Sequence, residues 1–490
     1  MKLPVSGVFD RRLWTLALVL AGALVLAQFW LRPPWRDEYW ALYFSAIHDP
    51  LVQALREKIS RDVHPPFYFS LLHFWRQLND GEIFARSLNL VFLALGAWAG
   101  WAMRARRERE TALFLLLCGT SFWLVFFSAE IRMMQGLFIA CALMTLAVRN
   151  ALDAPESAPR NIVIFCLLGM VAASSHYFGV LWTAALGLAA GVSRLRRGSV
   201  RGFLAYGVAS VAALVPILVW TLFARPDQNP GAIPPVEASF ATKLFEGLEQ
   251  FLRGLTTKTM FANLPAAICL FLGLAPALSR KDNEALQVIG GAIVVAVLVA
   301  FGIHLFHVPL IKERAFIVII PGLLYLTAAS ILSLREDQTK ALAIARYVPL
   351  AAVLSLPLFS SELFKDRERY SEVRAYLRDL PACAASPMLV YERPQEQAWD
   401  FSWFYTESVL KGVYTKAGPN LVRAAEPGAL ASFQPAEGCP VRVLALNMPK
   451  GEERDRAEMT AELTRLGVPV EDYELVSLGK GRSRILIEPD

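Results

Sequence analysis

Long apolar runs separated by short polar connections occupy most of this chain, from residue 13 to residue 360. A run of about 20 apolar residues is long enough to cross the hydrocarbon core of a bilayer as an α-helix. About eleven runs approach or reach this length, at 13–31, 83–103, 111–127, 131–148, 161–178, 179–192, 202–223, 263–278, 285–306, 315–334 and 341–360. In lipid, a single segment satisfies its own backbone hydrogen bonds only as a helix. The pattern therefore predicts a polytopic all-α membrane domain over residues 1–360.

The first run follows Asp10-Arg11-Arg12, as the apolar part of a secretory signal peptide also does. It is longer than such a segment, and no small-residue cleavage site closes it. Arg32 and Trp35 give it an interfacial end. We therefore expect an uncleaved membrane anchor with its N-terminus in the cytoplasm.

Basic residues concentrate in every second connection between the predicted spans, and this pattern predicts the orientation of each span across the membrane. The basic connections are 104–109, 149–160, 194–201, 280–281 and 335–346. Cytoplasmic loops carry an excess of Lys and Arg, so these connections are predicted to be cytoplasmic. The outer face then receives residues 32–82, 128–132, 224–261, 307–314 and the chain after residue 360. Within the first of these, residues 64–78 are apolar but too short to span, and predict an interfacial or partly re-entrant helix entered through Pro65-Pro66.

Composition agrees with a membrane protein and locates its charge. Hydrophobic residues make up 55% of the 490 residues and the mean hydropathy is +0.41, which is more apolar surface than one soluble core can bury. Residues 1–360 hold 32 Lys and Arg against 22 Asp and Glu, a formal charge of +10, whereas residues 361–490 hold 17 against 21, and together they give the net charge of +6. This excess belongs to the membrane loops and does not indicate a nucleic-acid site.

Residues 361–490 have a more polar composition and predict a soluble α/β domain on the outer face. Amphipathic charged stretches predict helices, and short apolar runs predict strands. The helices are expected at 362–380 and 457–466, the strands at 388–391 and 441–446, and a closing hairpin at 473–487. An oxidising compartment would allow Cys383 and Cys439 to pair, although the sequence alone leaves that pairing open.

Polar residues of the predicted outer face gather at helix ends, whereas the interiors of the spans carry almost no charge. This distribution predicts a site at the outer membrane surface. A lipid-linked phosphate fits there, because its phosphate lies at headgroup level while its apolar chain stays in the bilayer. Arg132, Lys312 and Arg314 are the candidate phosphate ligands. Each could instead be a snorkelling anchor, but Arg132 fits that alternative less well because it lies in the very short connection 128–132.

Asp37 and Glu38 follow the first span and supply a base. Transfer of a sugar from a polyprenyl phosphate requires deprotonation of the acceptor hydroxyl and stabilisation of the charge that builds on the departing phosphate. A carboxylate opposite a cationic clamp meets both requirements. The alternative is that the acidic pair faces water in an ordinary loop.

Four further residues are candidates for substrate binding: His64, Glu130, His176 and Tyr177. The two histidines have plain structural alternatives. His64 could cap the interfacial helix, and His176 could be a satisfied histidine at a helix end.

Several short motifs occur in a fixed order in the first 200 residues: Arg36-Asp37-Glu38, His64-Pro65-Pro66, Glu82–Leu88, Ser128–Arg132 and Ser175-His176-Tyr177. Their order resembles the membrane glycosyltransferases of the GT-C fold. The resemblance is greatest to the bacterial branch akin to protein O-mannosyltransferases and the aminoarabinose transferase of lipid A. Arg314 and Pro321 echo a later motif of the family, whereas residues 361–490 match none.

The resemblance implies an inverting glycosyltransferase that moves a sugar from a polyprenyl-phosphate donor to a lipid, glycan or protein acceptor. It implies action at the periplasmic face of a bacterial inner membrane. Asp37 would be the catalytic base with Glu38 beside it, and Arg132 and Arg314 would hold the donor phosphate. No metal or other cofactor is expected, because the branch it resembles is metal-independent. Asp37, Glu38 and Glu130 are the carboxylates that could otherwise hold a divalent cation.

Three other functions stay open. A lipid-linked glycan ligase or polymerase would share the topology and the donor, but would be expected to centre on a large outer loop between late spans. A transporter or flippase would need polar groups near the bilayer midplane, which the charge-poor spans do not provide. The unassigned C-terminal part also leaves open a sensor with a periplasmic binding domain.

Overall fold

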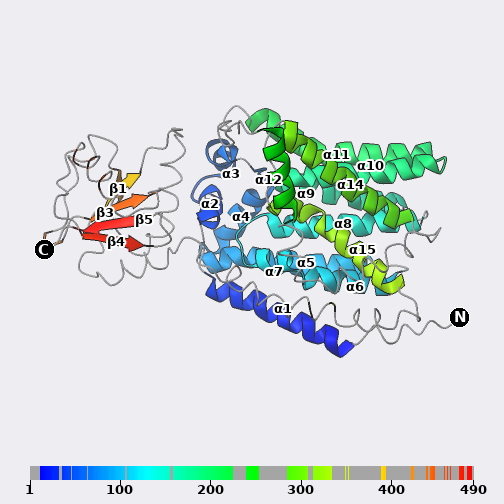
Figure 1. Ribbon diagram of the computed structural model, residues 1–490, viewed down its shortest axis with the longest axis horizontal. Coiled ribbons are helices and arrows are strands. Elements are labelled where there is room, and N and C mark those ends of the chain that lie inside the picture. Colours follow the sequence, from blue (N-terminus) through cyan, green and yellow to red (C-terminus); the bar gives the residue numbers. More distant parts are fainter. Residues whose placement is uncertain are drawn as a thin grey trace. The chain divides into compact units, whose positions relative to one another are not determined.

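The structure is a computed structural model (Figure 1). It describes residues 11–32, 36–45, 47–62, 64–104, 107–154, 158–224, 239–252, 284–306, 313–333, 348, 351, 388–392, 421–423, 437–439, 442–446, 457, 461, 464, 474–478 and 483–487. The chain forms two compact units. The helical unit consists of residues 1–32 and 44–363, and the sheet unit consists of residues 33–43 and 364–490.

The described elements before residue 334 are helices. They are α1 (Arg11–Leu31), α2 (Arg36–Phe44), α3 (Leu51–Glu57), α4 (Phe67–Leu78), α5 (Glu82–Ala102), α6 (Glu108–Gly119), α7 (Phe122–Ser128), α8 (Met134–Asp153), α9 (Ala158–Ser175), α10 (Tyr177–Arg196), α11 (Val200–Ala224), α12 (Phe240–Leu252), α14 (Glu284–Phe306) and α15 (Ile320–Ser333), with 3-10 turns η2 (Ile59–Arg61) and η6 (Glu313–Val318). Among the described residues, eight helices are long and apolar enough to cross a membrane, or nine if the bent pair α6–α7 is one span.

Nine of the predicted apolar runs coincide with these spans, and the other two, 263–278 and 341–360, lie outside the described residues. The run 111–127 is bent by 56° between α6 and α7. Gly119, Thr120 and Ser121 explain the break. The Thr120 hydroxyl donates to the Leu116 carbonyl, and the Ser121 hydroxyl accepts from the Leu124 N–H and so caps α7. The predicted interfacial helix is α4, which begins directly after Pro66.

Helix α8 lies at the centre of the helical unit and packs against α5, α9, α10, α14 and α15 (Figure 1). Most of its side chains are buried, whereas most of those of α1 and α11 are partly or fully exposed. Those exposed side chains are largely apolar, as the surface of a membrane-spanning bundle requires. We name the two ends of the helical unit after residues at the two ends of α8: the Arg132 end and the Arg149 end.

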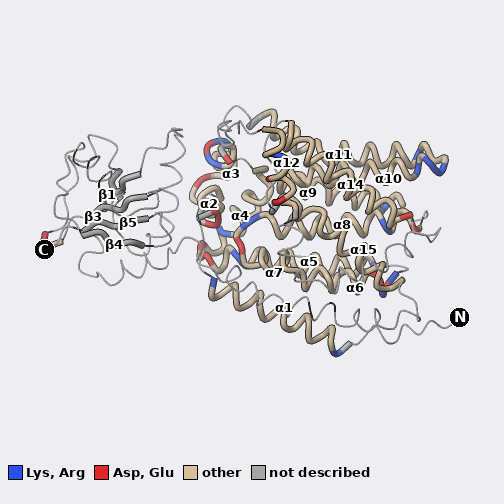
Figure 2. The backbone as a smooth tube through the Cα atoms, viewed as in Figure 1, with Lys and Arg blue, Asp and Glu red and all other residues tan. Residues whose placement is uncertain are grey.

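Charged residues of the helical unit gather at these two ends, and the middles of the helices carry few of them (Figure 2). At the Arg149 end, side chains from the loops predicted to share one membrane face meet in one network. Arg107 pairs with Asp153, Arg149 with Glu110, and Arg194 with Glu284. The basic loops 104–109, 149–160 and 194–201 therefore lie at the same end of the helical unit, as their alternation predicted. Which end faces the cytoplasm stays a prediction.

The sheet unit contains a five-stranded sheet in the order β2-β1-β3-β5-β4. The strands are β1 (Met388–Glu392), β2 (Leu421–Arg423), β3 (Arg442–Leu446), β4 (Glu474–Leu478) and β5 (Ser483–Ile487). Strands β2, β1 and β3 are parallel, and β5 is antiparallel to β3 and β4. The predicted strands and closing hairpin are present, and β2 was not predicted. The predicted helices fall in stretches of which the structure describes at most single residues, so the α/β class and the boundary near residue 360 stay predictions.

Cysteine placement follows the division between spans and tail. Cys118, Cys141 and Cys166 are free thiols on α6, α8 and α9. Cys439 forms a disulfide. Because Cys383 lies outside the described residues, its pairing with Cys439 stays a prediction.

Candidate functional site

The Arg132 end is built on a buried ion pair between the end of α1 and the connection from α7 to α8. Arg32 Nη2 lies 2.6 Å from Glu130 Oε1, and both side chains are almost completely buried. Arg32 also donates to the Phe126 carbonyl at 3.3 Å, and its guanidinium lies over the Phe126 ring. The structure thus gives Glu130, predicted to bind substrate, a structural partner. The sequence treated Arg32 only as an interfacial residue and missed this role.

Two residues of α5 hold the same connection in place. Asn89 donates to the carbonyls of Phe127 and Glu130. Arg86 donates to the Arg32 carbonyl at 2.7 Å and to the Phe29 carbonyl at 3.1 Å. These bonds satisfy carbonyls that the helix ends leave open and fix the path of residues 128–132.

Arg132 lies at the end of this fixed connection and is buried, with 7% of its surface exposed. A snorkelling anchor extends its charged group into water, so the burial of Arg132 disagrees with that alternative. Its backbone N–H donates to the Glu130 carbonyl at 2.8 Å. A buried guanidinium at a helix end is suited to bind an anion.

His64 and His176 come together although 112 positions separate them in the sequence. Their ring centroids lie 5.1 Å apart. His64 Nδ1 lies 2.6 Å from Asp62 Oδ1, and the His64 backbone N–H donates to the same oxygen. His176 Nδ1 accepts from the Phe178 N–H and caps α10. The helix-end interpretation is therefore right for His176. The capping interpretation is wrong for His64, because Pro66 is the N-cap of α4 and His64 bonds to Asp62 instead.

A half-open apolar groove with a cavity volume of about 210 Å³ runs between α4, α5, α8 and α9. On α8 its lining extends from Met133 to Leu143, which is about 15 Å along the helix axis. Leu95 and Trp98 line it and are 55% and 71% exposed, so the groove opens on the lipid-facing side of α5. One end is lined by Phe67, Tyr68, Met133 and Ser175. We call this end the groove mouth, and its lining residues adjoin Arg132 and His176 in the sequence.

The remaining candidate residues are placed as follows. Asp37 and Glu38 lie in the first turn of α2, within the sheet unit, and Glu38 is completely buried. Tyr177 begins α10 and is 38% exposed. Arg314 lies in η6 and only its backbone is described, and Lys312 lies outside the described residues. The convergence of Asp37, Glu38, Lys312 and Arg314 on one site with Arg132 therefore stays a prediction.

The described part of the chain holds no group of three or more His, Cys, Asp or Glu side chains that could bind a metal ion. Of the carboxylates considered for a cation, Glu130 pairs with Arg32. Independence from a metal stays a prediction.

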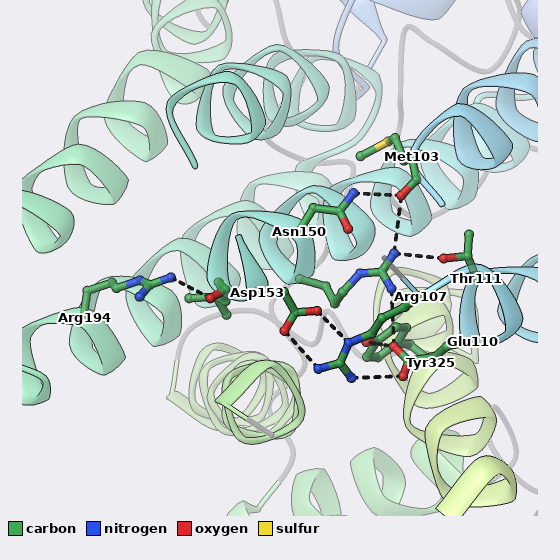
Figure 3. Close-up of polar contacts among 10 residues, drawn as sticks. Met103, Arg107, Glu110, Thr111, Asn150, Asp153, Arg194 and Tyr325 are labelled. Carbon is green, nitrogen blue, oxygen red and sulfur yellow. Dashed lines mark hydrogen bonds and ion pairs between the residues drawn. The ribbon is translucent and has the colours of Figure 1, made fainter. Parts of the chain in front are cut away.

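The Arg149 end holds a second buried cluster, which Figure 3 shows. Glu110 accepts from Arg107 at 3.1 Å and from the Tyr325 hydroxyl, and lies 3.5 Å from Arg149 Nη1. Arg149 also donates to Thr111 Oγ1 at 2.9 Å, and Arg107 Nε lies 2.7 Å from Asp153. Burial opposes the charge on Arg107, but Glu110 and the other acidic neighbours outweigh it and raise the pKa of Arg107. This cluster ties α6, α8 and α15 together at the end farthest from the groove mouth.

The chain has the GT-C fold, which confirms at the level of fold the resemblance seen in the order of the motifs. Among solved structures it is similar to the lipid A aminoarabinose transferase ArnT from Cupriavidus metallidurans. The apo state of ArnT aligns with a TM-score of 0.62 and 13% identity over 97% of each chain. ArnT bound to undecaprenyl phosphate aligns with a TM-score of 0.57 and 14% identity, over 97% of this chain and 98% of ArnT.

A more distant likeness is to the archaeal oligosaccharyltransferase AglB from Archaeoglobus fulgidus, solved with an inhibitory peptide and a dolichol-phosphate. It has 12% identity and a TM-score of 0.44, over 84% of this chain and 65% of AglB. No protein-family profile matches the sequence, and no curated protein matches it.

Proposed function

We propose that the protein is a membrane glycosyltransferase that takes its sugar from a polyprenyl-phosphate donor. Transfer to a lipid, glycan or protein acceptor would occur at the outer face of a bacterial inner membrane. The observation that carries the proposal is the apolar groove, whose mouth adjoins Arg132 and His176 in the sequence. An apolar channel open to lipid, lined at its mouth by the residue that follows the buried Arg132, suits a ligand made of an isoprenoid chain and a phosphate.

The groove favours an isoprenoid chain over a water-soluble ligand. Its lining is almost entirely apolar, and its exposed rim residues Leu95 and Trp98 belong to the lipid-facing surface of α5. A lipid tail can therefore enter sideways from the bilayer without crossing water. The solved complex of ArnT, which shares the fold, contains undecaprenyl phosphate, and this supports the same class of ligand here.

The proposed reaction is a displacement at the anomeric carbon of the donor sugar. The acceptor oxygen forms a bond to this carbon while its proton passes to the Asp37 carboxylate. The bond from the anomeric carbon to the phosphate oxygen breaks, and the polyprenyl phosphate leaves with the electron pair. Arg132 would stabilise the negative charge that increases on the phosphate during this step.

The test uses the purified protein in liposomes with a panel of radiolabelled polyprenyl-phosphate sugars and a membrane extract as acceptor source. Ala99 lines the groove, whereas Ala97 on the same helix is exposed away from it. Ala99→Phe fills the groove and should raise the KM for the lipid donor about tenfold, whereas Ala97→Phe adds the same side chain on the lipid-facing surface and should not. If no sugar label moves, or if both variants behave like the wild type, the proposal is wrong.

A further inference from the structure

The hairpin formed by α10 and α11 carries a cluster of arginines at the Arg149 end, and the proposed reaction does not use them (Figure 2). Helix α10 ends at Arg196, the turn 197–199 follows, and α11 begins at Val200. We call this region the hairpin tip. Its arginines are Arg194, Arg196, Arg197 and Arg201.

Two glycines keep the hairpin tip closed. Gly198 has a φ of 80°, in the left-handed region that glycine adopts most readily, and it turns the chain back on itself. At Gly202, a Cβ atom would lie 3.0 Å from the Arg194 Cβ and 2.9 Å from the Ser199 Oγ, so the glycine lets α11 approach α10 closely. The two helix ends that carry the arginines are therefore held together, and the backbone cannot separate them to reduce the repulsion between their charges.

One carboxylate on α14 compensates part of this charge. Glu284 Oε2 lies 3.3 Å from Arg197 Nε and 3.8 Å from Arg194 Nη1. Arg194 also donates to the carbonyls of Ala151 and Leu152 at the end of α8, at 2.9 and 3.1 Å. These two arginines therefore serve the packing of the hairpin against α8 and α14.

Arg196 and Arg201 point to a different role. Both are exposed, and in the part of the chain that the structure describes neither has an ionic partner. Four arginines against Glu284 leave an excess of positive charge at the hairpin tip. Basic residues beside the end of a membrane span attract anionic lipid headgroups.

An apolar stripe on α11 begins next to these two arginines. Val200, Leu204, Val208 and Val211 are each more than half exposed, and their spacing places them on one face of the helix. From Val200 to Val211 the stripe is about 17 Å long, whereas half of the hydrocarbon core of a bilayer is about 15 Å thick. The stripe can therefore contact a lipid chain through the whole depth of one leaflet. The headgroup of that lipid would then lie at the level of the hairpin tip.

We propose that the hairpin tip binds an anionic phospholipid of the leaflet at the Arg149 end. Arg196 and Arg201 donate charge-assisted hydrogen bonds to its phosphate oxygens, and its acyl chains lie along the stripe from Val200 to Val211. The site shares no lining residue with the apolar groove between α4, α5, α8 and α9. The inference is thus independent of the proposed sugar transfer, in which this phospholipid is neither donor nor acceptor.

Binding is measured on the purified protein in detergent micelles, with fluorescent phosphatidylglycerol as the anionic probe and phosphatidylcholine with the same label and chains as the zwitterionic probe. Arg196→Gln and Arg201→Gln should each weaken the binding of phosphatidylglycerol about fivefold, and R196Q/R201Q about 25-fold. The affinity for phosphatidylcholine should change little, because its headgroup carries no net charge. Wild-type affinity of R196Q/R201Q for phosphatidylglycerol would overturn the inference.

A second pair of arginines provides the matched control. Arg12 on α1 and Arg109 on α6 are exposed at the same end of the helical unit, so R12Q/R109Q removes the same charge from other helices. This variant should keep the wild-type affinity for phosphatidylglycerol. Equal losses in R12Q/R109Q and R196Q/R201Q would show that the lipid responds only to the net charge of this end, which would overturn a site at the hairpin tip.

Two further measurements separate a lipid site from a site for a soluble anion and from a loss of folding. Inorganic phosphate should displace the phosphatidylglycerol probe no better than chloride at the same ionic strength, and specific displacement by phosphate would overturn the assignment to a lipid. Phosphatidylglycerol should raise the thermal unfolding temperature of the wild type and of R12Q/R109Q but not of R196Q/R201Q. Without this lipid all three should unfold at the same temperature, and equal stabilisation by the lipid in all three would contradict the inference.

Discussion

Replacing Glu110 by Gln tests whether the buried cluster at the Arg149 end stabilises the helical unit. Arg107 keeps Asp153 as an ionic partner after this change, with contacts at 2.7 and 3.1 Å. Arg149 does not: among the described residues, its other partners are the neutral Thr111 hydroxyl, the Met103 carbonyl and the Tyr325 ring. Because the Arg149 side chain is completely buried, the substitution leaves a buried charge without an ionic partner.

The expected loss of stability depends on how deeply each ion pair is buried. Removing one partner of a buried ion pair costs about 3–5 kcal/mol, and the 3.5 Å separation of Arg149 and Glu110 places the cost near 3 kcal/mol. Asp153→Asn breaks a pair whose side chains are 28% and 17% exposed, so it should cost about 1 kcal/mol or less. Replacing the pair by uncharged groups in E110Q/R149M should recover most of the stability lost in E110Q.

The assay is thermal unfolding in detergent, followed with a dye that reacts with thiols as they become exposed. Cys118 and Cys141 are buried on α6 and α8, two of the helices that the cluster joins, so they report its loss. Glu108→Gln is the matched control, since Glu108 is exposed on the same helix. E110Q should unfold several degrees below both the wild type and E108Q. Equal unfolding temperatures of E110Q and E108Q would refute the assignment of a stabilising role to the cluster.

Two further predictions concern the proposed reaction. Asp37→Asn should reduce sugar transfer by a factor of about 10³ or more, because it removes the catalytic base. It should not lower the unfolding temperature, because it keeps the shape of the side chain. Wild-type turnover by this variant would contradict the role of Asp37. Arg132→Ala should weaken the use of the lipid donor by about tenfold or more, measured as KM in the liposome assay, and an unchanged KM would remove Arg132 from the site.

The spans could be predicted from the sequence because the requirement for apolar length is local. Most residues of α8 and α14 are apolar and their charged residues lie near the helix ends, so the signal does not depend on the partner helix. The bend between α6 and α7 is also local in origin, at Gly119-Thr120-Ser121, and these residues could have indicated it. Helices α2 and α3 were not predicted, because they are short and their stability depends on tertiary packing. Helix α12 was missed although its 13 residues have an amphipathic pattern.

The contacts within the site could be predicted only in part, because they join positions far apart in the sequence. Arg32 and Glu130 are 98 positions apart, and no local pattern links them. The sequence did contain an indication of this pair. A charged group at the end of a span is costly to remove from water, and two opposite charges in such places reduce that cost by pairing. Asp62 was missed although its spacing from His64, Asp-x-His, favours a local side-chain bond of the kind the structure contains.

For the acidic motif Asp37-Glu38, the sequence left two alternatives open, a catalytic role or an ordinary loop that faces water. Read as a loop, Asp37 and Glu38 could simply have faced water. The structure places both in the first turn of α2, where negative side chains gain about 0.3–1 kcal/mol from the helix dipole. Burial of a carboxylate costs several times that amount, and Glu38 is completely buried, so the dipole alone does not explain its position. The solvated-loop alternative is therefore excluded for Glu38, whereas Asp37 is only partly buried and its role as the base stays a prediction.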